Sequence, residues 1–498
     1  MKALISVTDK KFLANFAGDL EKMGWDIIAT PGTHNYLLDK GINSREISDC
    51  TGTDCLLNGK VKTLHPAIFA GLLATKSETD ELEFNDFNRI NLICCNPYKL
   101  TSNGENFSCR DEDCLNNIDI GGISLLRAGA KNYANVVVVS DNRDYKKVTD
   151  ALKNKSLDLE FRRKLAGKAF EFTAGYDRLL TNYFKPEEEK LSLKYSLNFK
   201  KNTNLRYGEN PHQKSALYGQ PPFTKIDNNT ELSFNNYQDI TAGVELAKNF
   251  NRPVSVIIKH TVPCGVARGE NIKVAYLKSL RADPMSAFGG IAVLNREVSP
   301  DLASVIKQNF YEVVVAPRFH RESVELLSQK KRLSIITYQD FKNGDDFRKV
   351  PGGLLVQDSD KFKLTTWKTV SKKEPEPDEI NDLKFAWKIA ARLKSNAAVI
   401  AGDNMSLGLG SGETARVDAV KIAALKMDRV EGIQKLENNF VMASDGFFPF
   451  PDSIEQAAGS GVKAVVEPGG SKNDDKIIKA ADRLGISLVF TGRRHFLH

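Results

Sequence analysis

The sequence predicts an α/β protein of more than one domain, and three observations support this prediction. Short apolar runs with the length of buried strands alternate with amphipathic stretches of helical period. Two polar segments, 184–204 and 369–383, interrupt the alternation. The chain has 498 residues, more than one hydrophobic core usually organises, so two or three domains are expected.

The first domain is expected to span residues 1–190 and to contain a parallel sheet. Its strands are expected at ALISV, WDIIAT, INLICCN and NVVVVS, and its first helices at DKKFLANFAGDLEKMG and HNYLLDKG. A Pro-Gly-Thr turn is expected between WDIIAT and HNYLLDKG, and residues 145–180 are expected to be helical. In such a sheet, ligands bind beyond the carboxyl ends of the strands.

The second domain, 191–498, is expected to hold two α/β halves, about 191–370 and 371–498. Strands are predicted at PVSVIIKH, GGIAVL, YEVVVAP and LSIITY in the first half, and at NAAVIA, NFVMAS, AVVEPGG and SLVF in the second. We expect the halves to form a tandem pair that shares one site.

Composition restricts the class of protein. Hydrophobic residues make up 41% and charged residues 27%, as in soluble globular proteins. The net charge of +7 is spread along the chain without a dense Lys/Arg block, so no nucleic-acid partner is expected. No run of about 18 apolar residues and no secretory signal occurs, so no membrane association is expected. The seven Cys are odd in number and lack C-x-x-C spacing, which favours a reducing cytoplasm over disulfides or structural zinc.

Two segments of the first domain combine charged side chains with glycine. NGKVKTLHP, 58–66, places Lys60 and Lys62 on one face of an extended chain, where they could clamp phosphate or an oxyanion. A solvated basic loop is the alternative. NNIDIGGISLLRAGAKN, 116–132, joins Asp119 to a Gly-Gly step and a helix ending in Lys131. Such a helix start can bind anions, but Asp119 could equally be a helix cap.

The most distinctive pair is Lys259-His260 at the end of the apolar run VSVII. We expect the strand to end there because Pro263, Cys264 and Gly265 follow and break the backbone. A Lys and a His can supply acid and base to one reaction, although two exposed polar residues at a strand end are the alternative. Cys264 lacks the second thiolate of a Pro-Cys-x-x-Cys zinc-deaminase site, so metal-free chemistry is expected.

Two further segments contain binding-type residues. LRYGENPHQ, 205–213, offers Arg206 for planar recognition of phosphate or carboxylate, although an Arg in a turn is usually structural. FFPFPD, 447–452, could form a rigid aromatic wall for a flat heterocycle, although an aromatic cluster in the core is the commoner use.

These motifs occur together, in this order, in one family. The matching stretches are ISVTDK, GKVKTLHP, IDIGG, LLRAGAKN, LRYGENPHQ, IIKHTVPCGVA, DPMSAFGGI, EVVVAP, GGLLVQD, FAWK, KSNA, SDGFFPFPD, PGGS and RHFLH. On these stretches the sequence resembles, along essentially its whole length, the bifunctional purine-biosynthesis enzymes. These join a transformylase for 5-aminoimidazole-4-carboxamide ribonucleotide (AICAR) to an inosine monophosphate (IMP) cyclohydrolase.

For the first domain, the resemblance implies a methylglyoxal-synthase-like fold that closes formyl-AICAR to IMP with loss of water. The implied catalytic set is Lys62, Tyr98, Asp119 and Lys131. The residues implied to hold the nucleotide and its phosphate are Ser6, Thr8, Thr30, Gly32, Thr33, Lys60 and Thr63.

For the second domain, the resemblance implies two cytidine-deaminase-like subdomains without zinc, which transfer a formyl group from the co-substrate 10-formyltetrahydrofolate to AICAR. His260 would take the amine proton, Lys259 would aid departure of tetrahydrofolate, and Asn396 would orient the formyl group. The implied nucleotide ligands are Arg206, Tyr207 and Arg494, with Asn236 and Asp239 nearby. The implied folate-side residues are Arg416, Phe447, Phe448, Pro449, Phe450 and Asp452. A homodimer is implied, because the family's transformylase site forms between two subunits.

Several residues depart from the usual pattern of that family. Pro31 stands where a Gly is usual and removes one backbone N–H, and Lys60 replaces a usual Arg. Val262, Glu413 and Ala415 replace a usual Asn, Gln and Ser. These departures leave two alternatives: a transformylase with an impaired cyclohydrolase, and a nucleotide-binding homologue without catalysis.

Overall fold

The structure is a computed structural model that describes residues 1–97, 115, 117–184, 195, 197, 199–227, 230–341, 344–363, 366–433 and 439–498. The chain divides into two compact units, Met1–Asn198 and Phe199–His498. Each unit has its own sheet and its own hydrophobic core.

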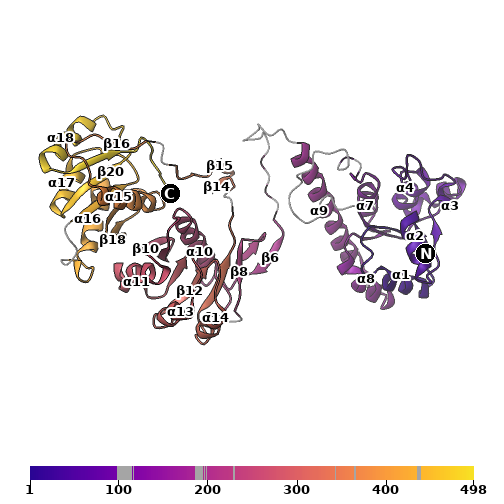
Figure 1. Ribbon diagram of the computed structural model, residues 1–498. Coiled ribbons are helices and arrows are strands. Elements are labelled where there is room, and N and C mark those ends of the chain that lie inside the picture. The colour runs from indigo at the N-terminus through magenta and orange to yellow at the C-terminus, as the bar shows by residue number, and fades with distance from the viewer. Residues whose placement is uncertain are drawn as a thin grey trace. The chain divides into compact units, whose positions relative to one another are not determined.

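The first unit contains a parallel sheet with the strand order β3-β2-β1-β4-β5 in its described part (Figure 1). The strands are β1 (Lys2–Val7), β2 (Asp26–Ala29), β3 (Arg45–Glu46), β4 (Leu92–Asn96) and β5 (Val137–Val139). The helices are α1 (Leu13–Lys22), α2 (Pro31–Asp39), α3 (Ser48–Thr51), α4 (Pro66–Leu73), α5 (Thr79–Phe84), α7 (Gly121–Lys131), α8 (Tyr145–Lys153) and α9 (Leu159–Phe184).

Side-chain alternation along β1 explains the two cores of this unit. Ala3 and Ile5 pack with α1 and α8 on one face of the sheet. Leu4 packs with α4 and α7 on the other face. The predicted parallel sheet is therefore confirmed. The turn expected at Pro31 is wrong: α2 begins at this residue, because Pro is pre-organised for the first helical position, where its missing N–H is not needed.

The second unit is built on one continuous sheet of 12 strands in its described part (Figure 1). In spatial order these are β16 (Lys368–Thr369), β21 (Ser487–Phe490), β20 (Val462–Glu467), β19 (Phe440–Ser444), β17 (Ala398–Gly402), β18 (Met405–Gly410), β10 (Val262–Arg268), β9 (Val254–Lys259), β11 (Gly290–Leu294), β12 (Tyr311–Ala316), β13 (Ser334–Tyr338) and β8 (Phe223–Lys225). Two separate ribbons pair β6 (Lys201–Asn204) with β7 (Ala216–Tyr218) and β14 (Asp346–Val350) with β15 (Gly353–Gln357).

Helices cover both faces of this sheet. They are α10 (Phe234–Ala247), α11 (Ile272–Ala282), α12 (Pro284–Ala287), α13 (Pro300–Lys307), α14 (Arg321–Ser328), α15 (Pro377–Ala390), α16 (Arg416–Met427), α17 (Asp452–Gly459) and α18 (Asp474–Leu484). α10 and α15 share one core on one face. On the other face α11, α13 and α14 cover β9 and β11–β13, and α16–α18 cover β17–β21.

The two halves of this sheet repeat one order of elements. α10-β9-β10-α11-β11 is followed by α13-β12-α14-β13, and α15-β17-β18-α16-β19 is followed by α17-β20-α18-β21. The halves join where β10 pairs antiparallel with β18. The tandem pair of α/β halves expected from the sequence is thus present, and the two halves share one sheet.

Candidate active sites

In the first unit, β1, β2 and β4 end at the same edge of the parallel sheet, where ligands bind in such folds. The Thr30 hydroxyl, directly after β2, lies 3.4 Å from the Ser6 hydroxyl and 3.4 Å from the Thr33 hydroxyl. Thr30 and Thr33 are buried. Three of the hydroxyl residues expected to hold the nucleotide therefore lie side by side.

Lys10, which the sequence analysis missed, adds a cation to these hydroxyls. Its Nζ donates to Thr33 Oγ1 at 2.8 Å and also to the carbonyl O of Val7. Burial lowers the pKa of Lys10, and the positive charge of Lys62 lowers it further. Two mutually repelling cations beside a row of hydroxyls would be stabilised by an anion such as phosphate. The available sequence signal was a Lys just past the end of the first strand.

Asp119 lies immediately before α7 and is held there by two hydrogen bonds. Its Oδ1 accepts the backbone N–H of Gly122 at 2.7 Å, and its own N–H donates to the Tyr176 hydroxyl of α9 at 2.8 Å. Asp119 therefore satisfies one N–H in the first turn of α7, although Ile120 is the N-cap residue of this helix.

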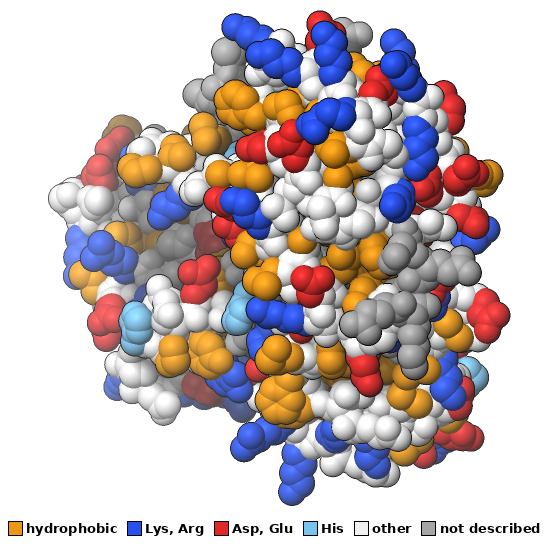
Figure 2. All heavy atoms as spheres, turned by 90° about the vertical axis from the view of Figure 1, so that its left-hand side faces the viewer, with side chains coloured by type: hydrophobic (Ala, Val, Ile, Leu, Met, Phe, Trp, Pro, Cys, Tyr) orange, Lys and Arg blue, Asp and Glu red, His pale blue; other side chains and the backbone are white. Residues whose placement is uncertain are grey.

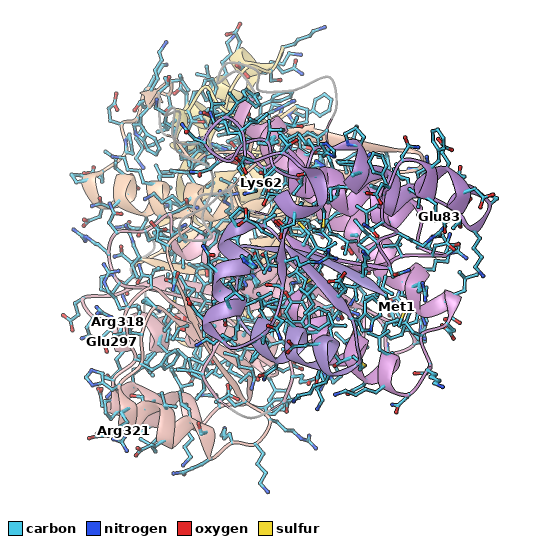
Figure 3. All side chains as sticks on the ribbon, turned by 90° about the vertical axis from the view of Figure 1, so that its right-hand side faces the viewer. Met1, Lys62, Glu83, Glu297, Arg318 and Arg321 are labelled. Carbon is cyan, nitrogen blue, oxygen red and sulfur yellow. The ribbon has the colours of Figure 1, made fainter. Side chains whose placement is uncertain are left out.

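The buried thiol of Cys95, in β4, connects Asp119 to the Lys62 segment. Burial raises the pKa of Cys95 well above its usual 9.0, the charge of Asp119 raises it further, and the charge of Lys62 opposes the shift. A Cβ on Gly121 would lie only 2.5 Å from Thr63 Oγ1, so Thr63 packs directly on the start of α7. Lys62, Thr63 and Asp119 are thus brought together near the carboxyl end of β4. Figure 3 shows Lys62 well apart from Met1, which precedes β1.

The remaining residues expected in this site have varied positions. Thr8 is exposed, and its N–H donates to Asn96 Oδ1 at 2.5 Å. Gly32 lies in the first turn of α2, and Lys60 is exposed. Tyr98 lies outside the described residues.

Lys131 lies at the opposite end of α7 from Asp119. The helix has 11 residues, and a rise of 1.5 Å per residue separates its ends by about 15 Å. Lys131 is exposed. Hydrogen bonds from Thr75 are the main cause of the lowered pKa of Glu78, and the nearby charge of Lys131 makes a smaller contribution. The structure therefore does not bring Lys131 to the Lys62–Asp119 cluster.

In the second unit, the strand register places the expected transformylase residues along one edge of the sheet. Lys259 pairs with Val262, and Ala398 pairs with both Gly410 and Ser444, so these strand ends lie on the same side. β10 and β17 flank β18. Strands lie about 4.8 Å apart, so the tip of the β9–β10 hairpin and the start of β17 are about 10 Å apart across the sheet.

Lys259 and His260 lie at the tip of this β9–β10 hairpin. Lys259 Nζ donates to the carbonyl O of Phe288 at 2.9 Å, whereas His260 is exposed. The break expected at Pro263–Gly265 is wrong: these residues lie within β10, and the chain turns at His260-Thr261. A shift of register between Pro263 and Gly265 accommodates the proline, which cannot donate to a regular ladder.

Three polar residues on neighbouring elements adjoin the hairpin tip. Asp239 of α10 is buried and accepts the Thr261 N–H at 2.5 Å. Asn236 is buried one turn earlier, and its Nδ2 donates to Glu312 Oε2 of β12 at 2.8 Å. Glu312 is exposed and was missed from the sequence, where it is an acidic residue inside the apolar run YEVVVAP.

Arg206 and Tyr207 lie in the loop between β6 and β7. The Arg206 guanidinium lies 4.7 Å from the centroid of the Tyr207 ring, and its Nη2 donates to the Tyr207 hydroxyl at 2.8 Å. Asn235 Nδ2, in the first turn of α10, donates to the carbonyl O of Glu209 at 3.2 Å. This bond ties the loop to the helix that carries Asn236 and Asp239.

Asn396 belongs to a polar network just before β17. Its Oδ1 accepts from Arg416 Nη2 at 2.7 Å, and its Nδ2 donates to the carbonyl oxygens of Glu413 at 2.8 Å and Thr414 at 3.1 Å. Arg416 is buried, and its Nη1 donates to the buried Asp445 carboxylate at 2.5 Å. Arg416 therefore positions Asn396, although the sequence suggested that Arg416 lines the folate side.

The FFPFPD segment only partly forms the expected aromatic wall. Phe447 and Phe450 are exposed, Pro449 is half-buried, and Asp452 is exposed at the start of α17. Phe448 is fully buried in the core, the commoner use of such a residue.

A buried carboxyl lies beneath this segment. The Phe448 backbone N–H donates to Glu467 Oε2 at 2.6 Å. Glu467 is fully buried at the end of β20, and burial raises its pKa to about 8.

His495 anchors the C-terminal segment that carries Arg494. Its Nδ1 lies 2.6 Å from Asp360 Oδ2, and its buried ring packs between Phe362 and Trp387. Arg494 is exposed, with its guanidinium 4.5 Å from the centroid of the Phe496 ring. Packing of His495 thus fixes the backbone from which Arg494 reaches the surface.

Sequence comparisons identify the family of this chain. A family described as "AICARFT/IMPCHase bienzyme" matches residues 129–426, more than half of the chain, and "MGS-like domain" matches residues 12–124. The chain belongs to the AICARFT/IMPCHase bienzyme family. The resemblance and the α/β fold class expected from the sequence are thereby confirmed.

Relatives within the AICARFT/IMPCHase bienzyme family match the whole chain. Proteins named "Bifunctional purine biosynthesis protein PurH" from Persephonella marina, Oceanobacillus iheyensis and Aquifex aeolicus are 41%, 39% and 41% identical. Each comparison covers 100% of this chain and 99–100% of the relative. A solved structure titled "Crystal structure of ForH" is 33% identical over 37% of this chain and 99% of its own, with a TM-score of 0.35.

The rest of the described surface holds a pocket, side chains of both charges and no metal-binding group. A pocket of about 530 Å³, lined by residues including Arg252, Arg268 and Lys278, lies at the far ends of β9 and β10 from His260, so it is separate from the hairpin tip. On the face in Figure 2, Lys and Arg alternate with Asp and Glu, and no dense basic stripe crosses the described side chains. Within the described ranges, no three or more His, Cys, Asp or Glu side chains are grouped to hold a metal ion, and no helix could cross a membrane.

Proposed function

We propose that this chain catalyses two consecutive steps of purine synthesis, one in each unit. The second unit transfers a formyl group from 10-formyltetrahydrofolate to AICAR, and the first unit closes formyl-AICAR to IMP. The observation that carries this proposal is the Lys259-His260 hairpin tip on the same sheet edge as Asn396, in a chain whose relatives match it from end to end.

In the formyl transfer, the 5-amino nitrogen of AICAR attacks the formyl carbon. His260 accepts the proton that leaves this nitrogen. The bond between the formyl carbon and N10 of tetrahydrofolate then breaks, and Lys259 donates a proton to N10. Arg206, Tyr207 and Arg494 hold the ribonucleotide, and Phe447 and Phe450 offer exposed rings to the folate.

The network around Asn396 limits what this residue can offer. Arg416 can only donate, and the carbonyl oxygens of Glu413 and Thr414 can only accept, so the orientation of the amide is defined. Both N–H bonds of Nδ2 are used, whereas Oδ1 keeps one lone pair. Asn396 therefore accepts a hydrogen bond from the reacting amine and helps to orient it toward the formyl carbon.

In the ring closure, the carboxamide nitrogen of formyl-AICAR attacks its own formamide carbon, and water leaves. Lys62 stabilises the oxyanion that develops on the formyl oxygen, and Asp119 exchanges protons with the reacting groups. The phosphate lies against Lys10, Ser6, Thr30 and the start of α2, where Pro31 removes one of the available N–H groups.

We place the domain boundary near residue 190.

The enzyme works as a homodimer in the bacterial cytoplasm. Met285 is 73% exposed and Phe288 65% exposed beside Lys259, so large apolar side chains near the hairpin are left uncovered by the described residues of the second unit. A second subunit would cover them and exclude water from His260. The bacterial relatives and the free Cys residues of the described chain support a reducing compartment.

One coupled assay tests both activities. The full chain receives AICAR and 10-formyltetrahydrofolate, and the tetrahydrofolate and IMP produced are measured separately. We expect equal amounts of both products. Production of tetrahydrofolate without IMP would indicate a transformylase with an impaired cyclohydrolase. The absence of both products would indicate a nucleotide-binding homologue without catalysis. The comparisons favour neither alternative.

A further inference from the structure

We infer that Asp239 is a positioning residue that holds the His260-Thr261 turn in its active shape, and does not bind the ribonucleotide. This inference rests on the proposed function, in which His260 accepts a proton from the AICAR amine. It is carried by the backbone of the turn, the contacts of the Asp239 carboxylate and the packing of α10.

The turn itself is unfavourable. His260 has a φ of 55° and Thr261 a φ of 63°, so both central residues of the hairpin lie in the left-handed region. Tight hairpins with two such residues strongly prefer Asn-Gly or Asp-Gly. A β-branched Thr in this region is a genuine outlier, and such strained residues persist only where the surrounding structure holds them. The local sequence therefore does not specify this turn.

Asp239 supplies the missing restraint. Its Oδ1 accepts the Thr261 N–H at 2.5 Å, and the backbone of His260 lies close enough to the same carboxylate to help lower its pKa. One buried acid, which is 8% exposed, thus satisfies the Thr261 donor of the turn. Because one of its oxygens is engaged by the turn and the side chain is buried, little of this carboxylate is accessible to a ribonucleotide.

Helix α10 gives this restraint a rigid base. Gly243 lies one turn after Asp239, and a Cβ there would lie 2.6 Å from Val293 Cγ2 and 3.4 Å from Ile258 Cγ2. The glycine therefore seats α10 closely on β9 just before Lys259. At the other end, Ser233 and Asn236 form a reciprocal capping box. The distance from the Asp239 carboxylate to the hairpin tip is consequently set by packing.

The pKa of the carboxyl agrees with this engagement. Burial raises the pKa of Asp239, and the hydrogen bond from the Thr261 N–H opposes that shift.

The test compares Asp239→Asn, which keeps the shape of the side chain, with Asp239→Ala and with the control Gln238→Ala, an exposed residue of α10. For Asp239→Ala we expect kcat of formyl transfer to fall about 100-fold, the effect of misplacing a reacting group by about 1 Å. KM for AICAR should change less than threefold. For Asp239→Asn, kcat should stay closer to that of the parent chain, because the amide oxygen of Asn can still accept the Thr261 N–H. Cyclisation of supplied formyl-AICAR should stay within twofold in all three variants.

A second measurement does not depend on activity. Hydrogen exchange of the Thr261 amide should be slow in the parent chain and in Gln238→Ala, at least tenfold faster in Asp239→Ala, and slower in Asp239→Asn than in Asp239→Ala. Unchanged exchange and kcat would overturn the inference, and so would a raised KM with kcat retained, because that result identifies a ligand contact. If the parent chain transfers no formyl group, the proposed function fails, and the exchange measurement alone decides whether Asp239 holds the turn.

Discussion

At the scale of single residues, His260 is the group on which the proposed formyl transfer depends most directly. General bases of this kind contribute about 10²–10⁴-fold to rate. His260→Ala should therefore lower kcat of formyl transfer by at least 100-fold, while cyclisation of formyl-AICAR stays within twofold. His320→Ala, an exposed histidine after β12, is the control and should retain both activities. Loss of both activities in a folded His260→Ala protein would contradict separate sites.

Arg416 is the residue on which the Asn396 network depends. Removing one partner of a buried ion pair typically costs 3–5 kcal/mol, because the other charge stays buried alone. Arg416→Met should therefore lower the free energy of unfolding of the second unit by roughly that amount and lower the rate of formyl transfer. Chemical denaturation is the measurement, with the exposed Arg429→Met as a control expected within about 0.5 kcal/mol of the parent. Equal stability of the two variants would exclude this role.

Glu467 makes stability depend on pH. Its folded pKa of about 8 exceeds its ordinary value of 4.5, so the folded state keeps a proton that the unfolded state has released between these values. Stability should therefore fall as pH rises from 4.5 to 8, by roughly 5 kcal/mol at most for this group. Glu467→Gln should stabilise the second unit by a few kcal/mol at pH 8 and by almost nothing at pH 4.5. Denaturation at the two pH values checks this; a gain that is the same at both would show that Glu467 is ionised in the fold.

At the scale of elements, glycines decide how closely helices approach the sheet. Gly265 was expected to break the backbone, yet it lies within β10, where a Cβ would be 2.0 Å from the Ser279 carbonyl O of α11. The sequence could not distinguish a glycine needed for a turn from one needed for helix–sheet contact. Pro263 misled the prediction for a related reason, since a change of register admits a proline to a strand.

Gly243 offers a test at this scale. Gly243→Ala should force α10 away from β9 and lower the stability of the second unit by about 1 kcal/mol, because an overpacking cost of 1–3 kcal/mol exceeds the gain in helix propensity. Formyl transfer should also fall, since α10 carries Asp239. Gly167→Ala in α9 is the matched control: open space surrounds that position, so the change should stabilise the first unit by about 1 kcal/mol. Thermal unfolding and both activities check the pair.

At the scale of the whole molecule, the two activities should respond differently when the protein is diluted. The Lys62–Asp119 cluster lies within one unit of one chain, whereas exposed apolar side chains flank His260. The specific activity of formyl transfer should therefore fall as the protein is diluted below the dissociation constant of its dimer, while cyclisation stays constant. Sedimentation at the same concentrations provides the oligomeric state. A monomer with full transformylase activity would contradict the shared site.

The sequence by itself determined the alternation of strands and helices, the parallel sheet of the first unit and the family. These features follow from the local hydrophobic period and from short motifs, and both signals are contained in residues that are close together in the sequence. It also indicated Lys259, His260, Asn396, Lys62 and Asp119 as candidates.

Only the tertiary structure decided which polar groups face a site and which support it. Asp239, Arg416 and Phe448 were expected at ligands; the structure shows that Asp239 accepts from a turn, Arg416 donates to an amide and Phe448 packs in a core. Lys10 and Glu312 reach the two site edges from the motifs ISVTDK and EVVVAP, in which the sequence had assigned neither residue a role. The physical reason is that burial and hydrogen-bond partners depend on strand register and on helix approach, which join residues far apart in the chain.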